Sequence, residues 1–482
     1  MSLFEAFGKW RGERPDEPAF LVSSDAGPKS VSWRRFTDAI ATVASFVDRT
    51  APRGTVAILG ENSPAWMAVH AACLFSGATV VPIDEALTAE EIAGRLKFVG
   101  VTVLFHAAPF AAKAQAVAKV VSGLVLCDLD AFFATAADDG SAFWARGPRY
   151  ASGQTSMIVF TSGTTSEPRG AELTVAGLEA FAAYASLALP MKPGERSVMV
   201  LPLHHIFGIA ATYCMLSCGV ALGACPDFRR LFDAVVCCRA DFLFLVPALV
   251  DVLAAKIEQR GTVAGEVLGH PLRWIVHGGA PISPRTCDRM EALGVRMLSA
   301  YGLTETTALY SIDVDGEEVR DGSAGRCPRL PSCEVKVSAA GELLTRSPGV
   351  MKGYFKMPER TAEVLDADGW LHTGDLGRID ADGTVWVTGR LSRTIVLSSG
   401  KKVAPEELEA LLLAIPGVDE AVVTGDGETR EIRAEVYGPV TPEALDRAVS
   451  ELNMGLPTYK RLSGVVIRPT PFPRTSSGKI CV

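Results

Sequence analysis

Residues 55–105, TVAILGENSPAWMAVHAACLFSGATVVPIDEALTAEEIAGRLKFVGVTVLF, decide the fold class. Three short apolar runs rich in β-branched residues alternate in this stretch with two longer segments of helical pattern. The runs are 55–59, 79–83 and 101–105, and the helical segments are 65–76 and 88–98. Short apolar runs joined by helices predict parallel strands with crossover connections. The stretch therefore predicts an α/β fold.

The same alternation continues toward the C-terminus, where further strand-like runs are followed by Gly, Pro or Ser and then by a helical pattern. These runs are 157–160, 196–201, 242–246 and 274–277. From about Glu334 the chain changes to short strands and tight turns. This change indicates a small β-rich subdomain attached to the larger α/β part.

A last unit begins near Gly389. It contains two predicted helices, 404–414 and 442–453, and two predicted strands, 421–424 and 432–437. The sequence thus predicts a large N-terminal part with mostly parallel sheets and a small α+β C-terminal domain. We expect the N-terminal part to span residues 1–390 and the C-terminal domain to span residues 391–482.

The composition excludes several classes of protein. The chain has 482 residues, 48% hydrophobic and 21% charged, with a net charge of −8. This is the composition of a globular protein, and the negative charge argues against a nucleic-acid polymer as partner. The N-terminal residues do not read as a secretory signal, and the most apolar window, 206–222, is interpreted as core helices rather than a membrane span. Eleven cysteines without paired C-x-x-C sets favour reduced thiols and a cytoplasmic location.

The strongest motif is the segment 160–170, FTSGTTSEPRG, directly after an apolar run. Its small residues let backbone N–H groups approach a phosphate, its hydroxyls donate to phosphate oxygens, and Arg169 offers a planar guanidinium. An ordinary Ser/Thr/Gly loop is the alternative interpretation. The chain contains neither a Walker A loop nor a G-x-S-x-G elbow, which argues against a P-loop NTPase and against a serine hydrolase.

Further polar segments are typical of nucleotide chemistry. They are 277–281 (HGGAP), 301–306 (YGLTET), 370–377 (WLHTGDLG), 389–393 (GRLSR) and 473–480 (PRTSSGKI). Glycines after a strand leave room for a flat ring beside Tyr301, while Thr304 and Glu305 suit a phosphate and its magnesium. Asp375 suits a vicinal diol such as ribose. Each segment alone also fits an ordinary turn.

In this order and spacing, the segments closely resemble the adenylate-forming enzymes, which include acyl-CoA and aryl-CoA synthetases, amino-acid-activating domains and luciferases. The resemblance covers nearly the whole chain. It implies attack of a carboxylate on the α-phosphate of ATP, with Mg²⁺, to give an acyl-adenylate and pyrophosphate. It further implies transfer of the acyl group to the thiol of CoA after the C-terminal domain, a mobile cap, has rotated.

The resemblance also implies roles for individual residues. The loop over the β- and γ-phosphates matches Thr161, Ser162, Gly163, Thr164, Thr165 and Arg169. The adenine pocket matches Gly278, Gly279, Ala280, Tyr301 and Gly302, and the ribose hydroxyls match Asp375 and Arg390. Thr304 matches the α-phosphate contact, Glu305 the magnesium ligand, and Lys479 the lysine that reaches the carboxylate and the α-phosphate. We therefore expect Lys479, Thr304, Glu305 and Arg169 to be the catalytic residues.

The second half-reaction matches the family less closely. The CoA-side face corresponds to Ser399, Gly400 and Lys401, and the hinge to Arg393, where the family usually has Asp. The paired arginines that usually follow the lysine loop are also missing. Two alternatives therefore stay open: a ligase that loads an acyl or peptidyl carrier protein or stops at the adenylate, and a weakly active nucleotide-binding scaffold.

The segment 203–208, LHHIFG, resembles the acyl-binding side of CoA ligases, which implies that His205, Phe207 and Gly208 line the acyl site. Amino-acid-activating relatives carry an Asp near this point, and residues 201–210 contain none. The flanking Ala, Leu, Met and Cys suit a fatty tail or an aryl ring, although a core helix is the alternative interpretation. The expected partners are a small carboxylic acid, ATP and CoA. The oligomeric state, monomer or homodimer, stays open.

Overall fold

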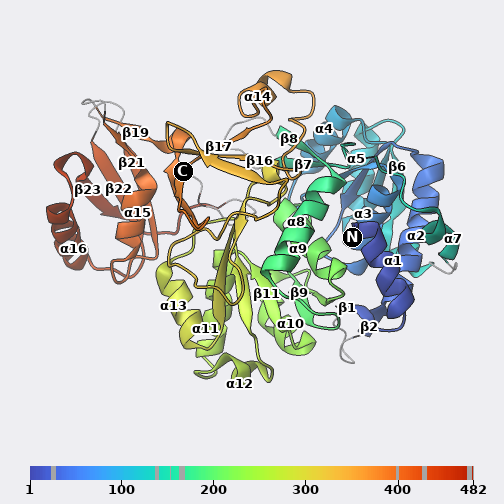
Figure 1. Cartoon of the computed structure of the whole chain (residues 1–482), viewed down its shortest axis with the longest axis horizontal. Helices are drawn as coiled ribbons and strands as arrows, with labels where there is room; N and C mark the ends of the chain where they lie inside the picture. Colours follow the sequence, from blue (N-terminus) through green and yellow to red (C-terminus); the bar gives the residue numbers. More distant parts are fainter. Residues whose placement is uncertain are drawn as a thin grey trace.

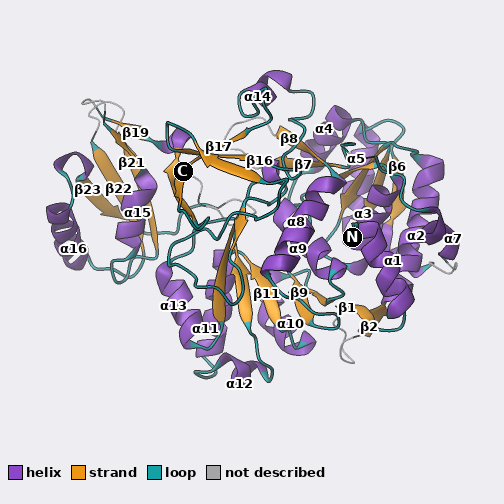
Figure 2. Ribbon diagram, viewed as in Figure 1, coloured by secondary structure: helices purple, strands orange, loops and turns teal. Residues whose placement is uncertain are grey.

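The structure, a computed structural model, describes residues 1–22, 29–135, 140–151, 153–161, 169–397, 401–425, 431–474 and 480. Figure 1 shows three parts arranged side by side: two neighbouring α/β layers, and a C-terminal unit set to one side. Figure 2 shows strands in the interior of each α/β layer with helices outside them. The α/β fold class predicted from the sequence is confirmed.

A six-stranded sheet organises the first part, in the order β6-β5-β3-β4-β7-β8. All its strands are parallel except β8, which runs antiparallel to β7. The strands are β3 (Thr55–Leu59), β4 (Thr79–Ile83), β5 (Val103–His106), β6 (Val125–Asp128), β7 (Met157–Thr161) and β8 (Arg169–Leu173). Its helices are α2 (Trp33–Thr50), α3 (Pro64–Ser76), α4 (Ala89–Val99), α5 (Ala111–Val120), α6 (Leu129–Ala134) and α7 (Ser141–Arg146).

Two further sheets make up the second α/β part, in the orders β2-β1-β10-β9 and β11-β12-β13-β14. The strands are β1 (Pro18–Val22), β2 (Lys29–Ser32), β9 (Arg196–Met199), β10 (Ala221–Ala224), β11 (Phe242–Leu245), β12 (Trp274–His277), β13 (Arg296–Tyr301) and β14 (Ser311–Ile312). The helices are α1 (Leu3–Glu13), α8 (Val175–Ala188), α9 (Ile206–Ser217), α10 (Leu231–Cys238), α11 (Pro247–Glu258), α12 (Ala264–Leu268) and α13 (Pro284–Ala292). β11, β12 and β13 are parallel, so their carboxyl ends meet at one edge.

The β-rich region expected from Glu334 is an antiparallel sheet, β15 (Glu334–Val337), β16 (Glu342–Arg346), β17 (Leu371–Ile379) and β18 (Val385–Arg390), with the short helix α14 (Pro358–Ala362). The C-terminal unit follows the 3-10 turn η4 (Leu391–Arg393). It contains β19 (Ile395–Val396), β20 (Lys402–Val403), α15 (Pro405–Leu413), β21 (Glu420–Gly425), β22 (Ile432–Tyr437), α16 (Pro442–Gly455) and β23 (Leu462–Ile467). Its apolar residues, from Ile395 to Leu462, form a core separate from those of the rest.

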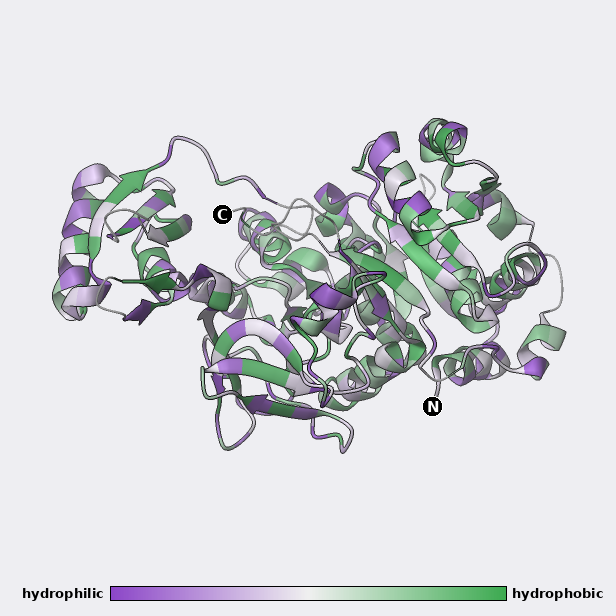
Figure 3. Ribbon diagram, turned by 90° about the horizontal axis from the view of Figure 1, so that it is seen from above, coloured by the Kyte–Doolittle hydropathy of each residue, from purple (hydrophilic) through white to green (hydrophobic). Residues whose placement is uncertain are grey.

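Local sequence explains why these elements form where they do. Thr88 and Glu91 make a capping box that starts α4, and Gly100 ends the helix in the left-handed conformation. All residues of α3 are buried, as expected for a helix that is apolar on every side. Figure 3 shows hydrophobic strands inside and polar positions on outward helix faces, which is the pattern of a buried sheet.

One prediction from the sequence is partly wrong. The apolar window 206–222 is not helical throughout, because α9 ends at Ser217 and the chain then enters the buried strand β10. Gly219 makes the turn between them, with a φ of 77°, where a side chain would also collide with Trp10. Among the described helices, none combines the length and the apolar character needed to cross a bilayer.

A buried histidine in this core makes stability depend on pH. His70 on α3 contacts the Tyr213 hydroxyl through Nδ1 at 2.8 Å, and burial lowers its pKa to about 3. Below about pH 6.5 the His70 imidazole of the unfolded chain binds a proton, whereas that of the folded chain stays neutral. The free energy of unfolding therefore decreases as the pH falls. His70→Phe should reduce the loss of unfolding free energy between pH 7 and pH 4.5 by about 2 to 3 kcal/mol, measured by urea denaturation.

Burial also lowers the pKa of His277, to about 4. Because His277 is present in both proteins, its contribution to the pH dependence cancels when the two are compared. His70→Phe also removes the partner of the Tyr213 hydroxyl, which lowers stability at every pH, so the readout is the difference between the two pH values. An identical pH dependence in both proteins would contradict the assignment.

Candidate active site

The predicted ribose site is a connected set of three side chains. Tyr301, the last residue of β13, donates its hydroxyl to Asp375 Oδ2 on β17 at 2.6 Å. Arg390, the last residue of β18, places Nε 2.7 Å from Asp375 Oδ1. Burial and the Asp375 carboxylate raise the pKa of Tyr301 well above its usual value, so its hydroxyl keeps its proton. Asp375, only 3% exposed, is thus held in a fixed orientation at the junction of two sheets.

The predicted magnesium ligand lies in a second set. Glu305, in the 3-10 turn η3 (Thr304–Thr306), accepts the Tyr354 hydroxyl on Oε1 at 2.7 Å. The Arg169 guanidinium lies over the Tyr354 ring, 5.6 Å from its centroid. Burial and the Glu305 carboxylate raise the pKa of Tyr354, which therefore stays a donor. Both predicted phosphate-side residues therefore contact the same tyrosine, Glu305 at its hydroxyl and Arg169 over its ring.

The backbone of β8 joins these residues to the phosphate loop. Arg169 pairs with Thr161 across the β7–β8 hairpin, and the Thr161 hydroxyl donates to the Arg169 carbonyl at 3.4 Å. Tyr354 forms an isolated bridge with Ala171, two residues further along β8. Ser162, Gly163, Thr164 and Thr165 lie outside the described residues. The two ends of the predicted phosphate loop are therefore fixed by β7 and β8.

The glycines predicted for the adenine pocket have a steric reason. A side chain on Gly278 would come within 2.8 Å of the Ala300 carbonyl and 3.4 Å of the Phe207 ring. One on Gly302 would come within 2.3 Å of the Ala308 carbonyl. Gly279 has a φ of 81°, in the left-handed region that favours glycine, and Ala280 follows in the same turn. Glycine at 278 and 302 therefore lets the chain after β12 and β13 pack closely against the backbone of Ala300 and Ala308.

The predicted acyl segment lies beside them. Phe207, in the first turn of α9, packs against Gly278, and Gly208 has no room for a side chain because the Pro202 carbonyl would be 2.5 Å away. His205 lines a small pocket of about 50 Å³ together with Thr161. The remaining lining residues are Pro82, Asp84, Arg95, Phe160 and His204. The acyl-side and phosphate-side residues therefore border a common pocket.

The predicted hinge residue is tied to the C-terminal unit. Arg393 pairs with Glu406 at 2.9 Å and with Glu409 at 2.6 Å, both on α15, and also donates to the Val423 carbonyl. The neighbouring carboxylates raise the pKa of Arg393 against the opposing effect of burial. On the predicted CoA side, Lys401 places its Nζ 4.1 Å from the Tyr459 ring centroid. Ser399 and Gly400 lie outside the described residues.

Lys479 also lies outside the described residues, but the segment before it is anchored. The Glu420 carboxylate accepts the Phe472 backbone N–H at 2.7 Å and pairs with Arg474. Arg474 forms an antiparallel bridge with Ile480. Both residues that flank the predicted lysine loop are therefore paired within the C-terminal unit.

Two residues of this arrangement were missed from the sequence. Tyr354 is isolated in a segment with no recognisable motif, and Glu420 is one of many acidic residues in the C-terminal unit. Both act on partners far away in the sequence, since Tyr354 is 49 residues from Glu305 and Glu420 is 54 residues from Arg474. No local pattern marks such pairs.

The chain matches family models over most of its length. Residues 7–355 match the model of the AMP-binding enzyme, and residues 392–481 match the AMP-binding enzyme C-terminal domain. An indoleacetate–CoA ligase from Aromatoleum aromaticum is 30% identical, with 100% of this chain and 96% of that protein covered. A feruloyl-CoA synthase from Amycolatopsis is 29% identical, with 99% of this chain and 97% of that protein covered.

Solved structures share the fold. ATP-bound MatB from Rhodopseudomonas palustris superposes with a TM-score of 0.83 at 22% identity, over 100% of this chain and 97% of the other. The o-succinylbenzoate CoA synthetase MenE from Bacillus subtilis, in complex with the acyl-adenylate OSB-AMP, gives 0.81 at 23% identity, over 99% and 96%. The family matches, the full-length relatives and the shared fold agree with the motif order: the chain belongs to the AMP-binding enzyme family.

Proposed function

We propose that this chain is an AMP-forming acid–thiol ligase that converts a fatty or aryl carboxylic acid to its acyl-adenylate and then to its CoA thioester. The observation that carries the proposal is the meeting of Tyr301, Asp375 and Arg390 on one side and Glu305, Tyr354 and Arg169 on the other. These residues come from distant segments, and Tyr301 and Glu305, one from each set, lie four residues apart at the end of β13. Relatives of nearly full-length coverage are named as CoA ligases, which supports the same reaction.

In the first step, a carboxylate oxygen of the acid attacks the α-phosphorus of ATP, the bond to the bridging oxygen breaks, and pyrophosphate leaves. Both reactants are anions, so the protein has to offset their repulsion and align them. Arg169 and Lys479 supply positive charge, and Thr304 contacts the α-phosphate. Asp375, fixed by Tyr301 and Arg390, holds the ribose hydroxyls. No protein nucleophile is required.

The described residues fit a magnesium ion that accompanies ATP. Mg²⁺ prefers oxygen ligands and is commonly held by one or two carboxylates plus phosphate oxygens. Glu305 offers such a carboxylate: Tyr354 occupies Oε1, and Oε2 makes no hydrogen bond to any described residue. When bound, the ion would neutralise charge on the departing pyrophosphate.

For the second step, we propose that the C-terminal domain, residues 391–482, turns about Arg393 and presents Lys401 with Ser399 and Gly400 to CoA. The acceptor is CoA rather than a carrier protein, which the names of the relatives support. We also propose that the enzyme acts in the cytoplasm, in keeping with the free thiol on each described cysteine.

A pyrophosphate-release screen over fatty, aryl and amino acids, with and without CoA, tests the function. We expect release with at least one aryl or fatty acid and formation of the matching acyl-CoA when CoA is present. Release without any CoA-dependent product would favour the carrier-protein alternative. No release with any acid would contradict the proposed function and favour a nucleotide-binding scaffold.

A further inference from the structure

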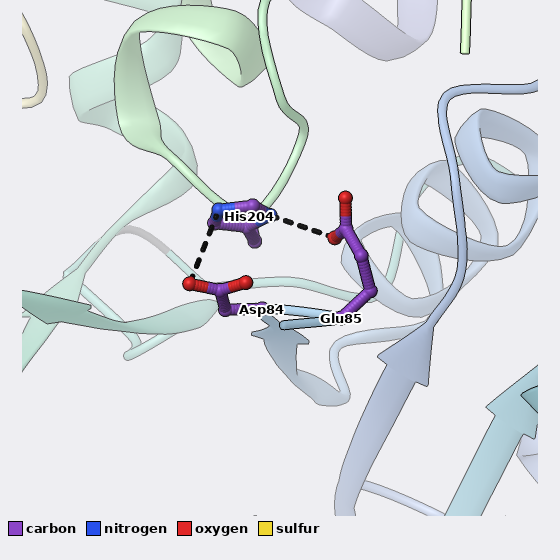
Figure 4. A group of neighbouring side chains, drawn as sticks. All are labelled: Asp84, Glu85 and His204. Atoms are coloured by element: carbon purple, nitrogen blue, oxygen red, sulfur yellow. Dashed lines mark hydrogen bonds and ion pairs between the residues drawn. The ribbon is translucent and has the colours of Figure 1, made fainter. Parts of the chain in front are cut away.

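A histidine and two carboxylates meet at the carboxyl end of β4, away from Glu305. Asp84 and Glu85 directly follow β4, and His204 precedes α9 (Figure 4). Glu85 Oε2 lies 3.1 Å from His204 Nδ1, and Asp84 Oδ2 lies 3.7 Å from His204 Nε2. One ligand atom from each residue can be chosen so that all three lie within 4.8 Å of one another. The imidazole thus stands between two carboxylates that approach its two nitrogens.

The two nitrogens of His204 are not equivalent. Nδ1 is hydrogen-bonded to Glu85, whereas Nε2 is buried and has no hydrogen-bond partner among the described residues. A neutral imidazole carries one N–H, so donation from Nδ1 to Glu85 leaves a lone pair on Nε2 facing Asp84. His204 is only 9% exposed, and an unpartnered buried nitrogen is costly. The position calls for an electron-pair acceptor, which no residue in the described ranges supplies.

The spacing of Nε2 and Asp84 suits a shared metal ion. A separation of 3.7 Å is too long for a hydrogen bond. Two ligands of one tetrahedral ion, each bound at about 2.0 Å, are separated by about 3.3 Å. A small side-chain adjustment therefore places both atoms on one ion. Metal-binding histidines typically donate their other N–H to a carboxylate, which is the arrangement that Glu85 provides.

Access to the cluster favours the same conclusion. Asp84 and His204 both line the pocket of about 50 Å³ that also contains His205 and Thr161. Each carboxylate residue has a cation nearby: Arg95 lines the pocket with Asp84, and Lys113 Nζ donates to the Glu85 backbone carbonyl at 2.6 Å. An ion at this position would keep open coordination positions toward the pocket.

We propose that His204 Nε2 and Asp84 bind a divalent transition-metal ion of the zinc or cobalt class, with Glu85 orienting the imidazole from outside the coordination sphere. Imidazole with carboxylate suits these ions, whereas magnesium prefers oxygen ligands alone. The site is separate from the nucleotide magnesium expected at Glu305. Since Asp84 and His204 line the same pocket as His205, the ion would have coordination positions left for an oxygen atom of a molecule bound there.

Cobalt(II) is the probe, because its visible absorption reports nitrogen and oxygen ligation. Full-length protein without a histidine tag is treated with a chelator and titrated with CoCl₂ in the absence of nucleotide. We expect one Co²⁺ per chain and displacement by ZnCl₂. His204→Gln and Asp84→Asn should each weaken Co²⁺ binding at least ~10-fold, and Glu85→Gln about 10- to 100-fold, as for other residues that orient a metal ligand.

His270→Gln is the matched control, because His270 also contacts a carboxylate, Asp241 at 3.0 Å, but is not part of this cluster. It should bind Co²⁺ like the unmodified protein. Equal binding by His204→Gln and the unmodified protein, or no binding by the latter at millimolar CoCl₂, would overturn the proposal. Circular dichroism of each variant shows that it is folded, and Glu85→Gln provides the test if His204→Gln is not.

Discussion

Replacing Lys479 by alanine is expected to lower acyl-adenylate formation roughly 10²- to 10³-fold, while thioester formation from preformed adenylate stays nearly unchanged. The reason is that the lysine offsets charge only while two anions combine at the α-phosphorus. Once pyrophosphate has left, attack by a thiol needs no cation at this position. Pyrophosphate exchange measures the first step, and CoA acylation from synthetic acyl-adenylate measures the second.

The basic C-terminal segment, residues 460–482, contains five basic and no acidic residues. Lys460→Ala is the control for a general effect of this segment. Its Nζ lies 2.7 Å from both carboxylate oxygens of Glu407, so its charge is already paired within the C-terminal unit. This variant should retain both steps. Equal loss of both steps in Lys479→Ala would refute the role assigned to the lysine.

Replacing Glu305 by glutamine should lower kcat/KM for adenylation by roughly 10²- to 10³-fold and raise the Mg²⁺ concentration needed for half-maximal rate. Glutamine keeps an oxygen that can accept the Tyr354 hydroxyl, so the local structure is preserved while the anionic ligand is lost. Initial rates of pyrophosphate release, measured over a range of MgCl₂ concentrations, give both quantities.

Tyr354→Phe tests the hydrogen bond that orients Glu305 separately from the binding of Mg²⁺ by the Glu305 carboxylate. It removes the hydroxyl donated to Oε1 but leaves the carboxylate and the ring beneath Arg169 in place. We expect a loss of about 10-fold, at the lower end of what residues that orient a metal ligand contribute. An unchanged Mg²⁺ requirement in Glu305→Gln would show that Glu305 is not the ligand.

Much of the fold could be predicted because its signals are local. The runs 55–59, 79–83, 274–277 and 432–437 coincide with β3, β4, β12 and β22, and the other predicted strands differ at their ends by one or two residues. Apolar β-branched runs between helical segments define buried parallel strands without reference to the rest of the chain. The window 206–222 misled because apolarity alone does not separate a buried helix from the buried strand that follows it.

The candidate site could be predicted as a set of motifs but not as a set of contacts. Nothing near Asp375 in the sequence indicates that Tyr301, 74 residues away, would hold it. The same is true of His204 and Glu85, which are 119 residues apart. The basic C-terminal segment gives a similar lesson, since Lys460, Arg468 and Arg474 each pair with a glutamate from another element. Its excess charge is therefore largely neutralised inside the folded unit.

The two arginines near the joint form ion pairs with different parts of the chain. Arg390 is fastened to Asp375 in the large part, and Arg393 is fastened to Glu406 and Glu409 in the C-terminal unit. Only Leu391 and Ser392 lie between them. Because peptide bonds stay planar, the proposed rotation of the C-terminal unit would have to be taken up by the backbone torsions of this dipeptide and its immediate neighbours. Such a rotation could leave both arginine ion pairs intact, because it would change only the backbone between them.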